Sequence, residues 1–325
     1  MNDNNITVKK AFNRIGVALL TVCALSIAIQ LLFVVVAGIV SKNEALLFES
    51  SWFKWVATFL PIYAAFFVGI LLIKKLPKDE CVSVKLGAKN FFIILLCCFP
   101  IMYGGNIIGT VLSELLSGGN TENGLNTYSL DNSLLKILVM VIFAPLLEEF
   151  LYRKQIIDRC ARYGEKTAIL FSALTFGLFH MNLFQFFYAF GLGLIFAYTY
   201  TRTRKLRYPV IMHMIINFIG SVIAPAIVSS IDMEMMYKLS TGVIDEAAIL
   251  PMLPQLIGFM LYAFTLLGLS IAGLVVLIVM AKKLVFLPKE EEIEKGKRFK
   301  TVYCNVGVIL FVMLCVAMCL LTLII

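Results

Sequence analysis

Long apolar runs alternate with short polar segments along the chain. A helix of about 20 residues is needed to cross the roughly 30 Å of hydrocarbon in a bilayer, and nine runs reach or approach that length. The predicted spans are Ile15–Val40, Trp52–Ile73, Phe91–Leu116, Leu134–Tyr152, Thr167–His180, Leu183–Tyr200, Pro209–Val228, Leu256–Met280 and Val302–Ile325. The fifth run is short for a span. The pattern predicts an all-α polytopic membrane protein, a bundle of about eight to nine transmembrane helices.

The composition supports the same class. Of the 325 residues, 61% are apolar and 15% are charged, whereas a soluble domain has about 25% charged residues. A soluble protein also needs a polar surface, because folding leaves much of its chain exposed to water. A soluble enzyme, a disordered regulator and a disulfide-rich secreted domain are therefore excluded. The eight cysteines fall in spans or basic loops, so we expect packing residues or free thiols.

The cationic residues predict the topology. Segments 1–14, 74–90, 153–166, 202–208 and 282–300 carry 24 of the 28 Lys and Arg residues, and they all face one side if the nine spans are right. Lys and Arg stay on the cytoplasmic side during insertion. The sequence thus predicts a multi-pass protein of the cell membrane with a cytoplasmic N-terminus and an external C-terminus. The net charge of +8 is therefore a signal of topology in a chain that spans the lipid bilayer, and nothing indicates a nucleic-acid partner.

An adjacent carboxylate pair lies at the end of the fourth span, in APLLEEFLYRK. Ionisable groups at membrane depth are costly and usually functional. Glu148 and Glu149 are about 100° apart on a helix, and Arg153 lies one turn after Glu149 on the same face. We expect a Glu149–Arg153 ion pair, which leaves Glu148 without a local partner and suited to act as a general base. The alternative is that both glutamates are simply solvated at a cytoplasmic helix end.

The chain contains two histidines, and both lie in apolar runs close to this pair. His180 follows Phe176 by four residues, and His213 precedes Asn217 by four residues, so each pair shares one helix face. A single histidine in an apolar run is usually a core residue with a backbone hydrogen bond. Two histidines and a carboxylate pair within one stretch of spans indicate a common site instead.

These motifs together resemble a known family. EEFLYR fits Glu-Glu-x-x-x-Arg, FGLFH fits Phe-x-x-x-His and HMIIN fits His-x-x-x-Asn, in that order. The set resembles the CPBP family of intramembrane proteases, the CAAX protease and bacteriocin-processing enzymes also labelled Abi. The resemblance covers residues 134–220 and divides the chain into N-terminal transmembrane helices (1–133), a catalytic core (134–220) and C-terminal transmembrane helices (221–325).

The resemblance implies an intramembrane endopeptidase that hydrolyses a peptide bond near or within the membrane. Glu148 and His180 would hold and activate the attacking water, and His213 and Asn217 would stabilise the oxyanion. Glu149 and its arginine would support them. The substrate would be a peptide or a membrane protein, such as a prenylated C-terminal tail or a bacteriocin leader.

Two mechanisms stay open, one with a metal ion and one without. Glu148, His180 and His213 form a His₂Glu set, which is a known ligand set for catalytic zinc, and the family is often described as metalloendopeptidases. The sequence has no His-Glu-x-x-His motif, which would fix two ligands on one helix. If Glu148 were a ligand, Glu149 would have to be the base. A metal-free glutamate–histidine mechanism is equally compatible.

The predicted spans place the site residues at different depths. Glu148 and His213 lie within about two turns of the predicted cytoplasmic side, whereas His180 lies about 20 Å along the fifth span from Thr167. For the three to meet, the fifth helix must be tilted, broken or begin earlier. An amphipathic cytoplasmic stretch from Tyr152 to Lys166 would allow this and leave an intramembrane cavity open to the cytoplasm.

Two other classes of function stay open. A non-enzymatic membrane scaffold or immunity factor would keep the fold without the chemistry, although no motif residue is lost. A proton-coupled transporter would use the glutamates and histidines as a relay, although such proteins often contain internal repeats and none is visible. The acidic external loop Ser230–Ile249 leaves room for partner binding in any of these classes.

Overall fold

The computed structural model describes residues 8–40, 50–79, 83–121, 123–124, 126, 128, 130–131, 134–232, 237–238, 241 and 250–324. Every regular element within these ranges is a helix, which confirms the predicted all-α class. The greater part of the acidic loop Ser230–Ile249 lies outside the described residues, so its expected partner-binding role stays a prediction.

Seven of the nine predicted spans are helices long and apolar enough to cross a membrane, counted over the described residues. They are α1 (Val8–Val40), α3 (Ser51–Ile73), α4 (Ala88–Ser117), α10 (Leu183–Thr203), α11 with its continuation through α12 (Arg207–Val228), α15 (Leu253–Ala281) and α17 (Val306–Ile324). The other two predicted spans are also helical, but one carries several charges and the other is short.

The fourth predicted span is one helical run that alternates between α and π geometry. Its segments are α6 (Leu134–Lys136), the π-helical Ile137–Phe143, α7 (Ala144–Glu149), the π-helical Phe150–Ile157 and α8 (Asp158–Cys160). π-helical segments are rare and often mark functional sites. The run therefore continues for more than two turns beyond the end predicted from hydropathy.

A sharp turn returns the chain after this run. A short 3₁₀ segment leads to Gly164, whose φ of 118° favours glycine, and α9 (Glu165–Phe179) follows. Glu148 lies 16 residues before Gly164, and His180 lies 16 residues after it. Both residues are therefore equally far along the chain from the turn. The starting points taken from the predicted spans were wrong, because the fourth helical run extends past Glu148 to Cys160.

The expected amphipathic stretch between Tyr152 and Lys166 is also wrong, because most of it is buried. Arg153, Asp158 and Arg159 are each at most 5% exposed. The Arg159 guanidinium donates from Nε to the carbonyl oxygen of Ile73 at 2.8 Å. Charged groups that are buried need such partners, so this stretch is an interior helix hairpin rather than a surface helix.

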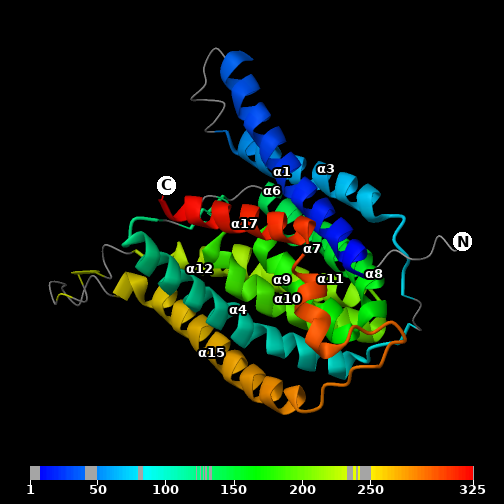
Figure 1. The fold of residues 1–325 in the computed structure, drawn as a ribbon. Coiled ribbons are helices and arrows are strands. Elements are labelled where there is room, and N and C mark those ends of the chain that lie inside the picture. The colour runs from blue at the N-terminus through cyan, green and yellow to red at the C-terminus, as the bar shows by residue number, and fades with distance from the viewer. Residues whose placement is uncertain are drawn as a thin grey trace, which may run out of the picture.

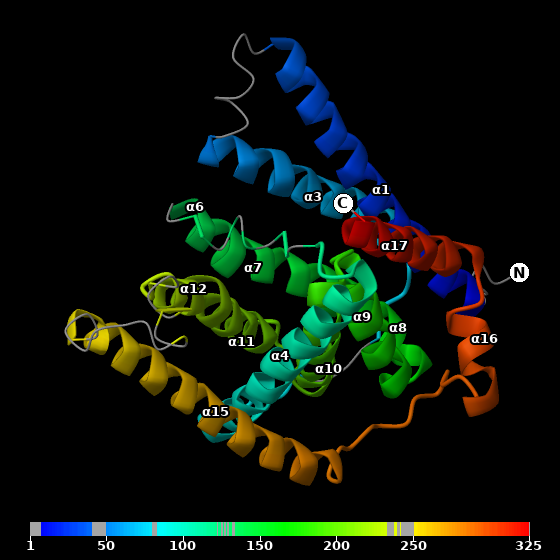
Figure 2. The ribbon, with the colours of Figure 1, turned by 90° about the vertical axis from the view of Figure 1, so that its left-hand side faces the viewer.

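The helices pack as layers around α10. Figure 2 shows α1 and α3 on one side of the molecule and α15 on the opposite side, with α4 and α7 to α12 between them. α10 packs against α4, α9 and α11, and α15 covers the outer face of α4. The helices flanking the predicted core thus enclose it.

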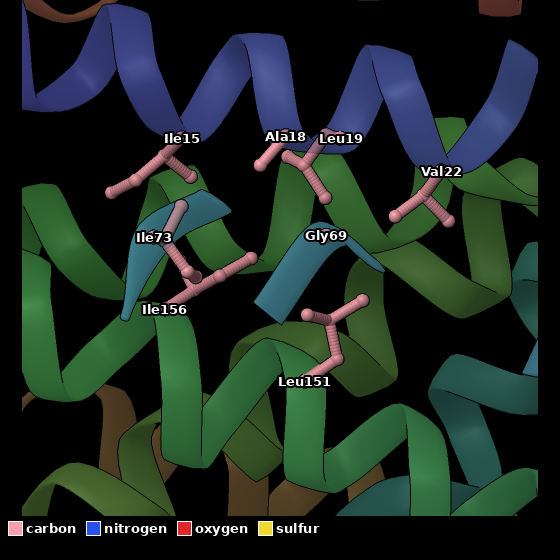
Figure 3. A pocket seen from close by; sticks show the side chains of 8 residues that line it. All are labelled: Ile15, Ala18, Leu19, Val22, Gly69, Ile73, Leu151 and Ile156. Carbon is pink, nitrogen blue, oxygen red and sulfur yellow. The ribbon is translucent and has the colours of Figure 1, made fainter. Parts of the chain in front are cut away.

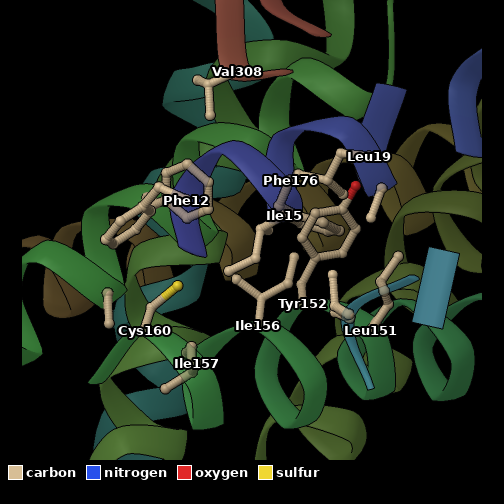
Figure 4. Close-up of a cluster of buried hydrophobic side chains, with 14 of the residues drawn as sticks. Phe12, Ile15, Leu19, Leu151, Tyr152, Ile156, Ile157, Cys160, Phe176 and Val308 are labelled. Carbon is tan, nitrogen blue, oxygen red and sulfur yellow. The ribbon is translucent and has the colours of Figure 1, made fainter. Parts of the chain in front are cut away.

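The main apolar core joins the N-terminal and C-terminal helices to the central hairpin. Figure 4 shows Phe12 and Ile15 of α1 together with Val308 of α17 and with Tyr152 and Phe176 of the central hairpin. All five are at most 2% exposed. Figure 3 shows an apolar space beside this core, enclosed by α1, α3 and the segment Phe150–Ile157, with no room for a water molecule. The first and last helices are therefore part of the scaffold of the core.

The predicted cytoplasmic loops meet at one end of the molecule. Arg204 pairs with Asp79 at 2.6 Å and with Asp158 at 3.3 Å, and Lys289 pairs with Asp79 at 2.9 Å. Figure 1 shows that α1 begins at this end and that α17 ends on the opposite side. The loops thus share one side, as the charge pattern requires. Which side faces the cytoplasm stays a prediction.

The crossing of α1 and α17 depends on two glycines. The backbone nitrogen of Gly307 donates to the Asn13 side-chain oxygen at 2.8 Å. A β-carbon on Gly307 would lie 2.2 Å from the Asn13 carbonyl oxygen, and one on Gly16 would lie 2.3 Å from the backbone nitrogen of Val308. Because these neighbours are backbone atoms, they cannot move aside cheaply.

We expect Gly307→Ala to separate α17 from α1 and to lower the free energy of unfolding by about 1–3 kcal/mol, the usual cost of overpacking. The measurement is thermal melting of the purified protein in detergent. Gly268→Ala is the matched control, because a β-carbon there meets nothing within 4 Å. Equal melting temperatures for the two variants would contradict the proposed close crossing.

Candidate active site

A buried ion pair fixes the end of α7. The Arg153 guanidinium donates to Glu149 from Nε at 2.8 Å and from Nη2 at 3.2 Å, and both side chains are 0% exposed. Arg153 also donates from Nη1 to the Ser172 hydroxyl at 2.8 Å, and that hydroxyl donates to the carbonyl oxygen of Tyr152. The pair predicted from helical spacing therefore forms, and it joins α7 to α9.

Glu149 has a second partner that helical spacing did not indicate. Its Oε1 lies 3.1 Å from Nδ1 of His213 on α11. Because a carboxylate can only accept, Nδ1 carries the hydrogen. The other ring nitrogen, Nε2, lies 3.8 Å from Oε2 of Glu148. The two adjacent glutamates thus contact opposite ends of one imidazole.

His180 lies at the end of α9, with its ring oriented by the backbone. Its Nδ1 lies 2.9 Å from the carbonyl oxygen of Phe176. Since a carbonyl can only accept, this nitrogen also carries the hydrogen, and in the neutral ring Nε2 keeps its lone pair. In the neutral form, both histidines therefore present an Nε2 that can accept a hydrogen bond.

The Phe176 ring connects the two histidines. Its centroid lies 5.0 Å from that of His180 and 5.9 Å from that of His213, both nearly edge-to-face. The same ring also contacts the Arg153 guanidinium, whose Cζ lies 4.8 Å from the ring centroid. Phe176 is 2% exposed. The phenylalanine of the Phe-x-x-x-His motif thus spaces the histidines and covers the buried ion pair.

Asn217 lies one turn after His213 and faces the fourth helical run. Its Nδ2 donates to the carbonyl oxygen of Met140 at 2.8 Å, within the π-helical segment Ile137–Phe143. An amide nitrogen carries two hydrogens, so one N–H remains for a second acceptor. This bond also ties α11 to the helix that carries the glutamates.

Two tyrosines near Glu148 were not identified from the sequence. Tyr63 on α3 and Tyr188 on α10 are both close enough to Glu148 for electrostatic interaction. The Tyr63 hydroxyl is buried and has no hydrogen-bond partner among the described residues. Neither tyrosine belongs to a motif, and Tyr63 precedes Glu148 by 85 positions. Only the packing of α3 against the core reveals its proximity.

Side-chain contacts thus bring together four of the six predicted residues, namely Glu148, Glu149, Arg153 and His213. Phe176 links His180 to this group, and Asn217 lies one turn after His213 on α11. Of the two best-defined cavities, neither is lined by these residues, so the intramembrane cavity stays a prediction. Within the described ranges no group of three or more His, Cys, Asp or Glu is arranged to hold a metal ion. Zinc binding by Glu148, His180 and His213 stays a prediction.

Comparison with known families supports the motif interpretation. Residues 130–219 match the family described as "Type II CAAX prenyl endopeptidase Rce1-like". The match includes all six predicted site residues and confirms the resemblance to the CPBP family over this part of the chain. Neither a curated protein nor a solved structure matches the chain.

We expect Glu149→Gln to lower the free energy of unfolding by about 3–5 kcal/mol, because it leaves the Arg153 charge buried without its partner. The measurement is thermal melting in detergent. Glu148→Gln is the matched control, since Glu148 forms no pair with Arg153 and should remain within about 1 kcal/mol of the wild type. Similar losses in both variants would show that Glu149 has no special structural role.

Proposed function

We propose that the chain, whose residues 130–219 belong to the Rce1-like family of type II CAAX prenyl endopeptidases, is an intramembrane endopeptidase. It hydrolyses a peptide bond of a peptide or membrane-protein substrate near or within the bilayer. The family match supports the class of reaction, and the geometry around the two glutamates supports the assignment of roles.

One observation carries the proposal. The Glu149 carboxylate accepts hydrogen bonds from Arg153 and from Nδ1 of His213. Its Oε1 lies 3.1 Å from that nitrogen. Glu148 faces the other ring nitrogen at 3.8 Å and has a side chain that is 15% exposed. The environment thus distinguishes two adjacent carboxylates, one held in a buried ion pair and one available for proton transfer. Such divergence between carboxylates is typical of acid–base sites.

In the proposed reaction, a water molecule binds between Glu148 and Nε2 of His180. Glu148 takes a proton from the water, and the water oxygen attacks the carbonyl carbon of the scissile peptide bond. The tetrahedral intermediate then collapses, the C–N bond breaks, and Glu148 returns the proton to the leaving nitrogen. The orienting hydrogen bond from His180 to the carbonyl of Phe176 keeps Nε2 directed away from the backbone.

His213 and Asn217 stabilise the oxyanion in this proposal. Asn217 supplies its remaining N–H. His213 can donate from Nε2 only when both ring nitrogens carry hydrogen, because Nδ1 already donates to Glu149. In that form its two ring nitrogens face Oε1 of Glu149 and Oε2 of Glu148. Donors aimed at the developing oxyanion contribute several kcal/mol to catalysis in other hydrolases.

The same contacts bear on the choice of base. In a zinc mechanism with Glu148 as a ligand, Glu149 would have to remove the proton. A carboxylate held by Arg153 and His213 is a poor base, because protonation would break a buried ion pair. This supports Glu148 as the base and leaves the metal question to experiment.

We expect Glu148→Gln to lower kcat by about 10²–10⁴-fold, the usual contribution of a general base, with little change in melting temperature. The assay uses internally quenched peptides in detergent or vesicles, with prenylated-cysteine, unprenylated and leader-type sequences, and identifies the products by mass spectrometry. Wild-type protein that cleaves none of them, while a cellular phenotype survives Glu148→Gln, would favour a scaffold or immunity factor.

A separate test addresses the metal. As an oxyanion donor, His213 replaced by Asn should cost about 10²–10³ in kcat without changing metal content. As a zinc ligand, the same change should remove bound metal. We expect wild-type activity to resist a chelator. Near-stoichiometric bound zinc in the wild type, together with loss of activity on chelation, would instead establish the metalloendopeptidase mechanism.

A further inference from the structure

A second cavity lies at the end of the molecule that carries the basic loops. It has a volume of about 240 Å³ and lies between α4, α10 and the end of α15. Its lining residues are Leu86, Asn90, Ile93, Ile94, Tyr198, Thr199, Arg202, Thr203 and Met280. None of them belongs to the candidate active site. The walls are therefore mainly apolar, with a guanidinium, an amide and three hydroxyls among them.

Two polar groups of this lining have no partner to satisfy them. The Thr199 hydroxyl oxygen and Nε of Arg202 are buried without a hydrogen-bond partner among the described residues. Thr199 is 1% exposed. Burying an unsatisfied polar group costs free energy, so a ligand that reached these groups would recover part of that cost. Arg202 forms an ion pair with Glu165, which holds its side chain in place.

The segment that follows α15 contacts Tyr198, one of the residues that line the cavity. The backbone nitrogen of Val285 lies 3.4 Å from the Tyr198 hydroxyl, and the Phe286 ring packs at 5.9 Å from that of Tyr198. Lys282 and Lys283 come two and three residues after Met280, and both are exposed. The cavity thus combines an interior guanidinium with lysines beside its lining.

The position of α15 indicates what can enter. Along its full length only Gly273 is buried, so α15 lies at the periphery of the bundle, where lipid surrounds a membrane protein (Figure 1). Gly273 also sets the approach of α15 to α4, because a β-carbon there would lie 2.2 Å from the Leu96 carbonyl oxygen. The cavity opens between the same two helices, beyond this point of closest approach.

We propose that this cavity binds the headgroup of an anionic phospholipid. The phosphodiester accepts hydrogen bonds from Arg202 and Thr199, the lysines contribute attraction, and the acyl chains remain in the bilayer beside α15. The volume is below the roughly 300–1,000 Å³ of pockets that enclose a whole small molecule, which fits a headgroup alone. Basic pockets between helices on one membrane face bind anionic headgroups in other membrane proteins. This binding is independent of the proposed hydrolysis.

The test measures melting temperature of delipidated protein in a neutral detergent against phosphatidylglycerol concentration. A ligand that binds the folded state raises the melting temperature with concentration. We expect a rise with phosphatidylglycerol and little rise with phosphatidylcholine or glycerol 3-phosphate. Lys282→Gln/Lys283→Gln should need about tenfold more phosphatidylglycerol for the same rise, since each cation near the headgroup contributes to binding.

Two further variants make the result specific. Lys295→Gln/Lys297→Gln removes the same charge from the same segment, away from the cavity, and should respond like the wild type. Thr199→Val keeps the shape and removes the unpartnered hydroxyl, and it should weaken the response several-fold. Equal rises with phosphatidylglycerol and phosphatidylcholine, equal responses of the two double variants, or a full rise with glycerol 3-phosphate would each overturn the proposal.

Discussion

The buried carboxylate of Glu149 is the interaction on which the rest of the site depends. An unpaired charge at 0% exposure would be too costly to retain, and here it is paired with Arg153 on its own helix and with His213 on α11. The guanidinium in turn holds the Ser172 hydroxyl on α9. One carboxylate thus links the three helices that carry the glutamate, histidine and asparagine motifs. Removing it would affect both the fold and the position of His213.

The ion pair lies in an unusual fourth helix. The run from Leu134 to Cys160 alternates between α and π segments, and a π turn changes the direction in which following side chains project. Met140 offers its carbonyl to Asn217 from the first π segment, and Arg153 projects from the second. The glutamates lie on the α segment between them. The irregular geometry thus occurs where the site residues must meet.

The outer helices contribute through packing and through charge. α1 and α17 cross at a distance that only glycines permit, and both pack on the hairpin that carries Tyr152 and Phe176. At the basic end, Arg204, Asp79 and Lys289 connect loops that are distant in sequence. The flanking segments, which carry no motif, therefore support the core from outside, and α3 brings Tyr63 close to Glu148.

The sequence by itself determined the class, the apolar spans, the side shared by the basic loops and the six motif residues. Hydropathy and charge act over short windows, and the Glu149–Arg153 pair follows from helical spacing alone. Tertiary structure decided what depends on contacts between distant segments. These are the extension of the fourth helical run to Cys160, the Glu149–His213 contact, and the burial of a stretch expected at the surface. A hydropathy window ends a span at its first charged residues. It cannot show that Arg153 and Arg159 have buried partners 19 or more residues away, which allow the helix to continue inside the protein.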